Sequence, residues 1–136
     1  MVKQPAVLLV EDNELLREVF KHTLASVGCR IIGEASTQKD AIALYNNERP
    51  DLVLLDIRLA IGDGLAVLEE LIENDPDAYV VMLTSMGEDS IKDRCLQSGA
   101  QGFIAKGRSA DELIGDIETH LVALGLPFQL SVVKSE

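Results

Sequence analysis

The sequence has no tryptophan, only two tyrosines and three phenylalanines, and few basic residues, with 12 Lys and Arg against 23 Asp and Glu. The formal net charge is −11. Binding to nucleic acid requires clustered cations for the phosphates, usually with aromatic side chains on which bases stack. These two shortages argue against direct binding of nucleic acid by this chain.

Cysteines and long apolar runs are also scarce. Cys29 and Cys95 lack a C-x-x-C spacing and a nearby histidine, which favours reduced thiols over a zinc site or a disulfide. His22 and His120 have no neighbours that indicate metal binding or catalysis, and we interpret both as structural or surface residues. No apolar run could span a bilayer, and the N-terminus lacks a signal-peptide core. We therefore expect a cytoplasmic location without membrane association.

What the sequence does contain is a strict alternation of short apolar segments and helical patterns. The apolar segments are residues 6–10, 30–34, 51–56, 79–83 and 102–105, and a helical pattern follows each of them, the last one to about residue 124. This alternation predicts an α/β fold of three layers, with helices on both faces of a parallel sheet. The simplest arrangement is the doubly wound, flavodoxin-like (βα)5 sheet with strand order 2-1-3-4-5.

Chemically active side chains follow or end four of these apolar segments. They are Glu11 and Asp12, Asp56, Thr84, and Lys106. Because the carboxyl ends of parallel strands share one edge of the sheet, we expect these residues to converge there. Two carboxylates ~4 Å apart repel by about 4 kcal/mol at an effective dielectric of about 20, so the cluster needs a raised pKa, the Lys106 cation or a metal. Oxygen ligands of this kind suit Mg²⁺.

Each residue by itself also has a purely structural explanation. Asp12 or Asn13 could cap the first helix, the Thr84 hydroxyl could satisfy backbone at a strand end, and Lys106 could be a solvated loop residue. Phe103 alone is more typical of a packing residue than of a switch. The structural explanation does not account for acids, a hydroxyl and an amine at the ends of four different strands.

The ordered set of motifs resembles the response-regulator receiver domains of two-component signalling, over about residues 5–124. The motifs are V-E-D-N at 10–13, L-D at 55–56 with Gly64 eight positions after the aspartate, L-T-S at 83–85 and G-F-I-A-K at 102–106. The resemblance implies a receiver domain over residues 1–124. Residues 125–136 are then a C-terminal tail or the start of a linker to an absent output domain.

The same resemblance implies a phosphoacceptor and its metal ligands. Asp56 would accept a phosphoryl group from the phosphohistidine of a sensor histidine kinase or of a histidine phosphotransfer protein. Asp12, Asp56 and the backbone carbonyl of Arg58 would bind Mg²⁺, with Glu11 acting through water. The chain would be a signalling domain that assists its own phosphorylation and dephosphorylation, rather than an enzyme.

The resemblance also implies a switch. Thr84 and Lys106 would contact the phosphoryl oxygens, and Thr84 would move while Phe103 swings inward. This movement would repack the surface formed by the fourth helix, the fifth strand and the fifth helix. That surface would contact an output domain, a downstream target protein or a second copy of the chain.

Two departures from the family pattern and two variable positions concern the loops around the site. Ala60 stands where relatives usually carry proline, so we expect a more mobile loop. Gly107 follows Lys106 where a cis proline is usual, and since a cis bond before a non-proline residue costs ~3 kcal/mol we expect a trans peptide and a different local path. Arg58 and Met86 flank the acceptor, and we hypothesise that Arg58 shields the phosphoryl group from water and gives a long-lived phosphorylated form.

Four other functions share part of this pattern. A haloacid-dehalogenase-type phosphatase needs a second Asp two positions after its nucleophile, where this chain has Arg58. A flavodoxin-like cofactor binder needs a first loop that accepts phosphate, and Glu11 and Asp12 would repel that phosphate. A nucleotide hydrolase needs a G-x-x-x-x-G-K loop, which the sequence lacks. The remaining alternative is a phosphorylation-independent interaction module. The presence of the complete set of site residues argues against it, namely Asp12, Asp56, Thr84 and Lys106.

Overall fold

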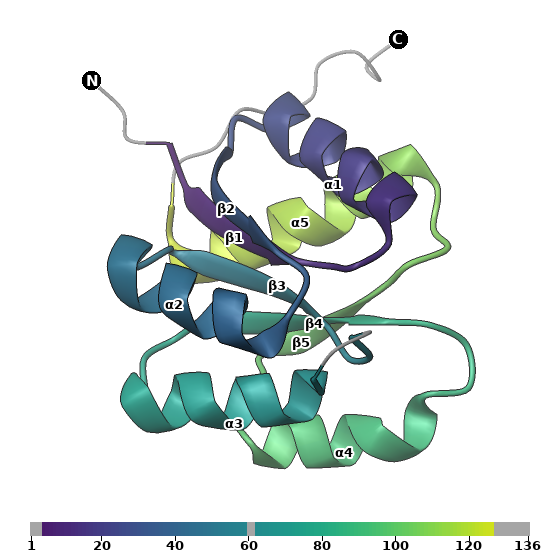
Figure 1. Ribbon diagram of the computed structural model, residues 1–136. Helices are drawn as coiled ribbons and strands as arrows, with labels where there is room; N and C mark the ends of the chain where they lie inside the picture. Colours follow the sequence, from purple (N-terminus) through teal and green to yellow (C-terminus); the bar gives the residue numbers. More distant parts are fainter. Residues whose placement is uncertain (1–3, 60–61, 127–136) are drawn as a thin grey trace, which may run out of the picture.

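The computed structural model describes residues 4–59 and 62–126, which form five strands and five helices in strict alternation (Figure 1). In chain order they are β1 (Ala6–Val10), α1 (Glu14–Ser26), β2 (Arg30–Ala35), α2 (Gln38–Glu48), β3 (Leu52–Asp56), α3 (Gly64–Asn74), β4 (Val80–Thr84), α4 (Asp89–Gln97), β5 (Gly102–Ala105) and α5 (Ala110–Leu124). The strands are parallel in the order β2-β1-β3-β4-β5. The doubly wound sheet predicted from the sequence is therefore confirmed.

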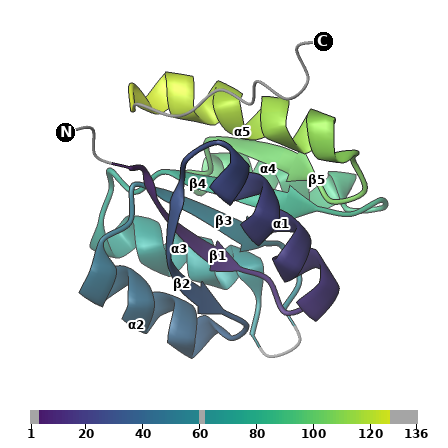
Figure 2. The same ribbon diagram turned by 90° about the horizontal axis from the view of Figure 1, so that it is seen from above.

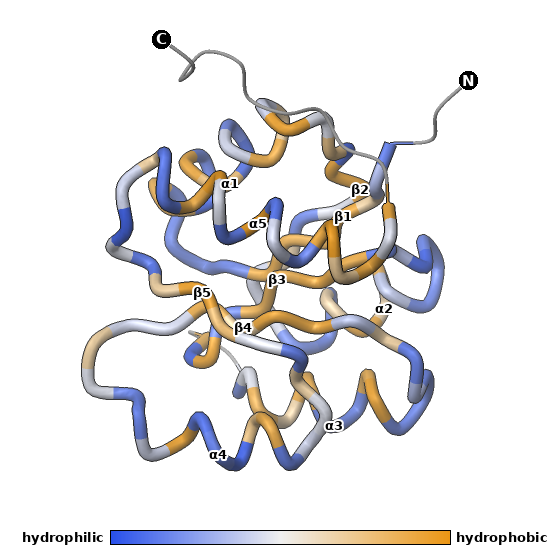
Figure 3. Tube along the Cα trace, turned by 180° about the vertical axis from the view of Figure 1, so that it is seen from behind, coloured by the Kyte–Doolittle hydropathy of each residue, from blue (hydrophilic) through white to orange (hydrophobic). Residues whose placement is uncertain are grey.

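The molecule has three layers. Helices α1 and α5 cover one face of the sheet, and α2, α3 and α4 cover the other (Figures 1 and 2). Strands β1, β3 and β4 are buried at every residue, so alternate side chains enter two separate hydrophobic cores. In β1, for example, Leu8 and Val10 pack on the α2–α3 side, whereas Val7 and Leu9 pack on the α1–α5 side. Figure 3 shows these strands as a mainly hydrophobic centre.

Side-chain caps define where several helices begin. Asn13, and not Asp12, is the N-cap of α1, and its side chain accepts a hydrogen bond from the backbone of the first turn. Ser109 and Glu112 form a reciprocal capping box at the start of α5, as the sequence predicts. Gly125 ends α5 with φ 71°, a left-handed conformation that glycine adopts without steric cost.

The start of α3 is held unusually close to the end of β3. The Gly64 N–H donates to the Ile57 carbonyl at 3.0 Å. A Cβ atom at Gly64 would collide with the backbone carbonyl oxygens of Asp56 and Ile57. Glycine is therefore required here for close backbone approach, and this contact fixes the segment directly after Asp56.

Some details differ from the sequence-based expectations. Strand β4 includes Thr84 because β5 continues beside it, with Thr84 opposite Ala105 and the Lys106 N–H donating to the Thr84 carbonyl at 2.8 Å. The peptide bond before Gly107 is trans, as expected. The departure at Ala60 and the tail from residue 127 onward lie outside the described residues.

Two further expectations concern chemistry away from the site. Cys29 and Cys95 are both free, as their spacing predicts, and both are buried. Among the helices of residues 4–59 and 62–126, none has the length and apolar composition needed to cross a membrane.

Candidate functional site

The carboxyl edge of the sheet holds a cleft of about 920 Å³. Its walls come from the ends of β1, β3, β4 and β5 and from the loops that follow them. The residues expected to hold the metal or the phosphoryl group all line it, namely Glu11, Asp12, Asp56, Arg58, Thr84 and Lys106, and so does Met86. The doubly wound order brings them together because it places β1 beside β3 and both near β4 and β5.

Lys106 connects the two most deeply buried acids of the cleft. Its Nζ lies 2.8 Å from Asp56 Oδ1 and 3.2 Å from Glu11 Oε1, and its side chain is 14% exposed. Burial alone would lower the pKa of Lys106, but the hydrogen bond and charge of Asp56, followed by Glu11, outweigh it and raise that pKa. The ammonium therefore stays charged at neutral pH and partly neutralises the cluster.

The two buried carboxyls carry perturbed pKa values. Burial, helped by the charge of Asp56, raises the pKa of Glu11 to about 7, although the Asn13 N–H that donates to Glu11 Oε2 at 3.0 Å and the Lys106 ammonium both oppose the rise. Burial also raises the pKa of Asp56, while the Lys106 ammonium and the Arg58 N–H, 3.1 Å from Oδ1, oppose the rise. Perturbed acids gathered in a cleft are typical of functional sites.

The acidic part of the cleft has the donor set of a divalent-cation site. Glu11, Asp12 and Asp56 each offer one carboxylate oxygen, and these oxygens lie within 4.8 Å of one another. Glu11 Oε1 is buried and accepts no hydrogen bond of good geometry from the described residues, although Lys106 Nζ is near it. Hard oxygen donors with unused lone pairs fit Mg²⁺ better than softer metals.

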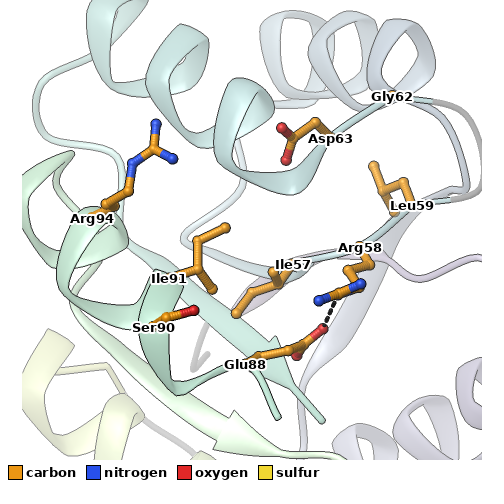
Figure 4. Close-up of a pocket in the computed structure, with 9 residues that line it drawn as sticks. All are labelled: Ile57, Arg58, Leu59, Gly62, Asp63, Glu88, Ser90, Ile91 and Arg94. Carbon is orange, nitrogen blue, oxygen red and sulfur yellow. Dashed lines mark ion pairs between the residues drawn. The ribbon is translucent and has the colours of Figure 1, made fainter.

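The residues flanking this cluster take different positions. Thr84 is 4% exposed and ends β4. Arg58 turns its guanidinium toward Glu88, with Nε 2.8 Å from Oε2 (Figure 4), whereas Met86 is fully exposed. Phe103 does not line the cleft; it is half-buried against the α2–α3–α4 core, and Lys92 Nζ lies 5.5 Å from its ring centroid.

Glu88 was missed by the sequence analysis. It is 4% exposed, and its Oε1 accepts a hydrogen bond from the Ser85 N–H at 2.6 Å. In the sequence it resembles any acid near a helix N-terminus, four positions after Thr84. Its burial depends on how the β4–α4 loop packs against the loop after β3, and no local pattern encodes that packing.

Comparison with known proteins agrees with this geometry. The family description "Response regulator receiver domain" matches residues 7–118. The chemotaxis protein CheY of Bacillus subtilis is 32% identical over 115 residues, which cover 85% of this chain and 96% of that protein. The response regulator GacA of Pseudomonas aeruginosa is 33% identical over 109 residues, which cover 79% of this chain and 51% of GacA.

Solved structures show the same fold. NtrX from Brucella abortus superposes with a TM-score of 0.84 at 31% identity, covering 90% of this chain and 28% of NtrX. A chain of the CheX–CheY–BeF3–Mg²⁺ complex from Borrelia burgdorferi gives a TM-score of 0.81 at 27% identity, covering 88% and 90%. The chain thus spans about half the length of GacA, a smaller part of NtrX, and nearly all of CheY. With a match of this extent, the chain belongs to the receiver-domain family of two-component response regulators.

Proposed function

We propose that this chain is a Mg²⁺-dependent phosphoacceptor, in which Asp56 receives a phosphoryl group from the phosphohistidine of a sensor histidine kinase or of a histidine phosphotransfer protein. The observation that carries the proposal is the position of Lys106 Nζ, 2.8 Å from Asp56 Oδ1 and 3.2 Å from Glu11 Oε1, inside a buried acidic cleft. A structural ion pair needs only one carboxylate, whereas a phosphoryl acceptor needs an excess of acids and a fixed cation.

The chemistry asked of these side chains is nucleophilic displacement at phosphorus. A carboxylate oxygen of Asp56 forms the new P–O bond while the P–N bond to the donor imidazole breaks and its electron pair passes to nitrogen. Charge on the transferring group spreads over three oxygens, so positioning and fixed cations supply most of the catalysis. Lys106 stabilises one of these oxygens, and the Thr84 hydroxyl donates a hydrogen bond to another.

Asp12, Asp56 and the backbone carbonyl of Arg58 are the proposed metal ligands, with Glu11 bound through water. When bound, Mg²⁺ would neutralise negative charge on the carboxylates and on the phosphoryl oxygens. The clustering of the three carboxylates, with one oxygen of each within 4.8 Å of the others, supports this assignment. Glu11 keeps the cluster acidic, and the Asn13 N–H holds its other oxygen in place.

Phosphorylation would act as a switch on the surface formed by α4, β5 and α5. Thr84 would move toward the phosphoryl group, and Phe103 would move into the space released, since the two lie on the neighbouring strands β4 and β5. A phosphoryl group shifts such a two-state equilibrium only through contacts made in one state. We propose that the altered surface binds an output domain, a downstream target or a second copy of the chain.

The boundaries and location of the domain are part of the same proposal. Residues 1–124 would form the receiver, with residues 125–136 as a tail or the start of a linker. Both cysteines are free and buried, which suits the reducing cytoplasm, where the proposed phosphodonors act.

The test is phosphorylation by acetyl phosphate with Mg²⁺, followed by intact-mass measurement. We expect one added phosphoryl group in the wild type, none after Asp56→Ala, and none when EDTA replaces Mg²⁺. Asp51→Ala is the matched control, because Asp51 lies at the opposite end of β3 and accepts a hydrogen bond from the Ala6 N–H. A wild type that stays unmodified but still binds a partner through the α4–β5–α5 surface would favour a phosphorylation-independent interaction module.

A further inference from the structure

Glu88 is a buried carboxylate that the proposed reaction does not use. It is the N-cap residue of α4, yet its side chain makes no capping hydrogen bond to that helix. Only 4% of it is exposed. A buried carboxylate is costly to desolvate unless donors satisfy it, so its partners indicate what it does.

Both partners of Glu88 are donors next to the acceptor. Its Oε1 accepts from the Ser85 N–H at 2.6 Å, and Ser85 directly follows Thr84. Its Oε2 lies 2.8 Å from Arg58 Nε, and Arg58 lies two residues after Asp56. Ser85 and Arg58 also line the acidic cleft. Each of them is therefore within the surroundings of an anion carried by Asp56.

Glu88 draws the guanidinium away from that cleft. Glu88 lines a second cavity of about 550 Å³, between the loop after β3 and helix α4 (Figure 4). Arg58 lines both cavities. The Arg58 side chain is 77% exposed, so rotation of its flexible stem can bring the guanidinium to either cavity. In the structure it points into the α4 side, toward Glu88.

We propose that Glu88 is a positioning residue that competes with the phosphoryl group for the Arg58 guanidinium and the Ser85 N–H. In the unphosphorylated protein Glu88 holds both donors, and a phosphoryl group on Asp56 replaces it as their acceptor. This inference rests on the proposed function, since it requires an anion on Asp56.

The competition couples the acceptor to α4. A phosphoryl group carries more negative charge than one carboxylate, so charge-assisted hydrogen bonds to it are favoured. Once both donors leave, Glu88 is a buried carboxylate without these partners, an unfavourable state unless the side chain moves into water. Because Glu88 is the N-cap residue of α4, movement of its side chain into water would shift the start of that helix. The contacts of Glu88 with Arg58 and Ser85 therefore weaken binding of an anion at Asp56, and their loss couples that binding to a change at α4.

The experiment measures the affinity of trifluoroberyllate, a non-covalent phosphoryl mimic, in saturating Mg²⁺ by calorimetry. Glu88→Gln keeps an oxygen acceptor for the Ser85 N–H and removes the charge that attracts Arg58. We expect it to bind trifluoroberyllate about two- to fivefold more tightly than the wild type, the size typical of an ion pair with one exposed partner. In the Arg58→Ala background most of the Glu88→Gln gain should disappear, because this substitution acts on the ion pair with Arg58 and keeps an acceptor for the Ser85 N–H.

Two measurements keep this result distinct from a general change in charge or stability. Glu69→Gln is the matched control, an acid that links α3 to Ser98 rather than to Arg58, and it should leave the affinity within error of the wild type. The Arg58 Nε–H resonance should move on Glu88→Gln in the metal-free protein and again when trifluoroberyllate binds.

An equal gain in both backgrounds, or no gain, would overturn the assignment of Glu88 alone. Failure of the wild type to bind trifluoroberyllate and to accept a phosphoryl group would instead overturn the proposed function, and this inference with it.

Discussion

The two ends of the sheet use polar side chains in opposite ways. At the amino end they complete backbone hydrogen bonds. Asp51 accepts from the Ala6 N–H at 2.8 Å, and Gln101 accepts from the Val80 N–H at 2.8 Å while it donates to the Ala78 carbonyl at 3.2 Å. These contacts satisfy backbone N–H and C=O groups at the strand ends, which folding removes from water.

At the carboxyl end, ionisable side chains meet one another instead. Lys106 contacts two acids, Glu11 and Asp56, and a nearby pair joins Arg58 to Glu88. Burial raises the pKa of both Glu11 and Asp56 and so disfavours their charged forms. Since carboxylates outnumber cations in this cluster, some carboxylate oxygens can accept another ligand. In this molecule, Asp51 and Gln101 complete the backbone hydrogen bonds of the sheet, whereas the side chains that meet other charges form the candidate site.

The largest expected effect comes from removing the cation of the carboxyl end. Lys106→Met should lower the rate of phosphoryl uptake from acetyl phosphate by about 10²- to 10³-fold, because it deletes one fixed donor to the transferring group. Gln101→Ala at the amino end should leave that rate unchanged. It should lower the free energy of unfolding by about 1–3 kcal/mol, because the Val80 N–H loses its hydrogen-bond acceptor. Mass-resolved time courses and urea unfolding of both variants check this. A reversed pattern would contradict the division between the two ends.

The next effect concerns the backbone packing that supports the acceptor. Gly64→Ala should lower the free energy of unfolding by about 3 kcal/mol, because the new Cβ meets the carbonyl oxygens of Asp56 and Ile57, and neither can move without shifting β3. It should also slow phosphoryl uptake. Gly115→Ala on α5 is the control: no atom lies near that Cβ, and a stabilisation of about 0.5–1 kcal/mol is expected. Equal stability changes in the two variants would show that the Gly64 contact is not restrictive.

A more gradual effect, with a slope of up to ~1.4 kcal/mol per pH unit, should appear in the pH dependence of stability without divalent cations. The pKa of Glu11 rises from 4.5 to about 7 on folding, so between these values the folded protein binds more protons than the unfolded chain. Its contribution to the free energy of unfolding therefore falls as the pH rises through that window. Asp56, whose pKa is also raised by burial, contributes with the same sign.

The amino end provides the opposite sign. Burial lowers the pKa of His120 below 6.5, so its contribution to stability is present above pH 6.5 and is lost as the pH falls through the folded value. We expect urea unfolding in EDTA from pH 4.5 to 7.5 to show that the free energy of unfolding of Glu11→Gln increases relative to that of the wild type as the pH rises. His120→Gln should show the reverse trend. Parallel curves for Glu11→Gln and the wild type would remove Glu11 from this explanation.

The smallest effect is expected where a polar pair lies far from the cleft. The Tyr79 hydroxyl is 2.9 Å from His120 Nδ1 at the amino end. Tyr79→Phe should lower the free energy of unfolding by about 1 kcal/mol through the lost hydrogen bond, with phosphoryl uptake unchanged. A change in the uptake rate would mean that the two ends of the sheet are energetically coupled.

The sequence predicted the fold closely because each level of information agreed. Apolar runs of strand length alternated with capped helical patterns, and this alternation leaves few topologies. Errors were confined to element ends: β4 extends to Thr84 because its neighbour β5 continues beside it. The choice between Asp12 and Asn13 as the cap of α1 also needed the structure, since both side chains can cap a helix.

The sequence by itself determined which residue types follow each strand, and strand order then placed them at one edge. Tertiary structure decided how these groups share charge: the burial that raises the pKa of Glu11, the Nζ that reaches two acids, and the turn of Arg58 toward Glu88. The reason is physical. A residue's type and its place along a strand are local properties, whereas desolvation and the distance between charges depend on segments that meet only in the folded protein.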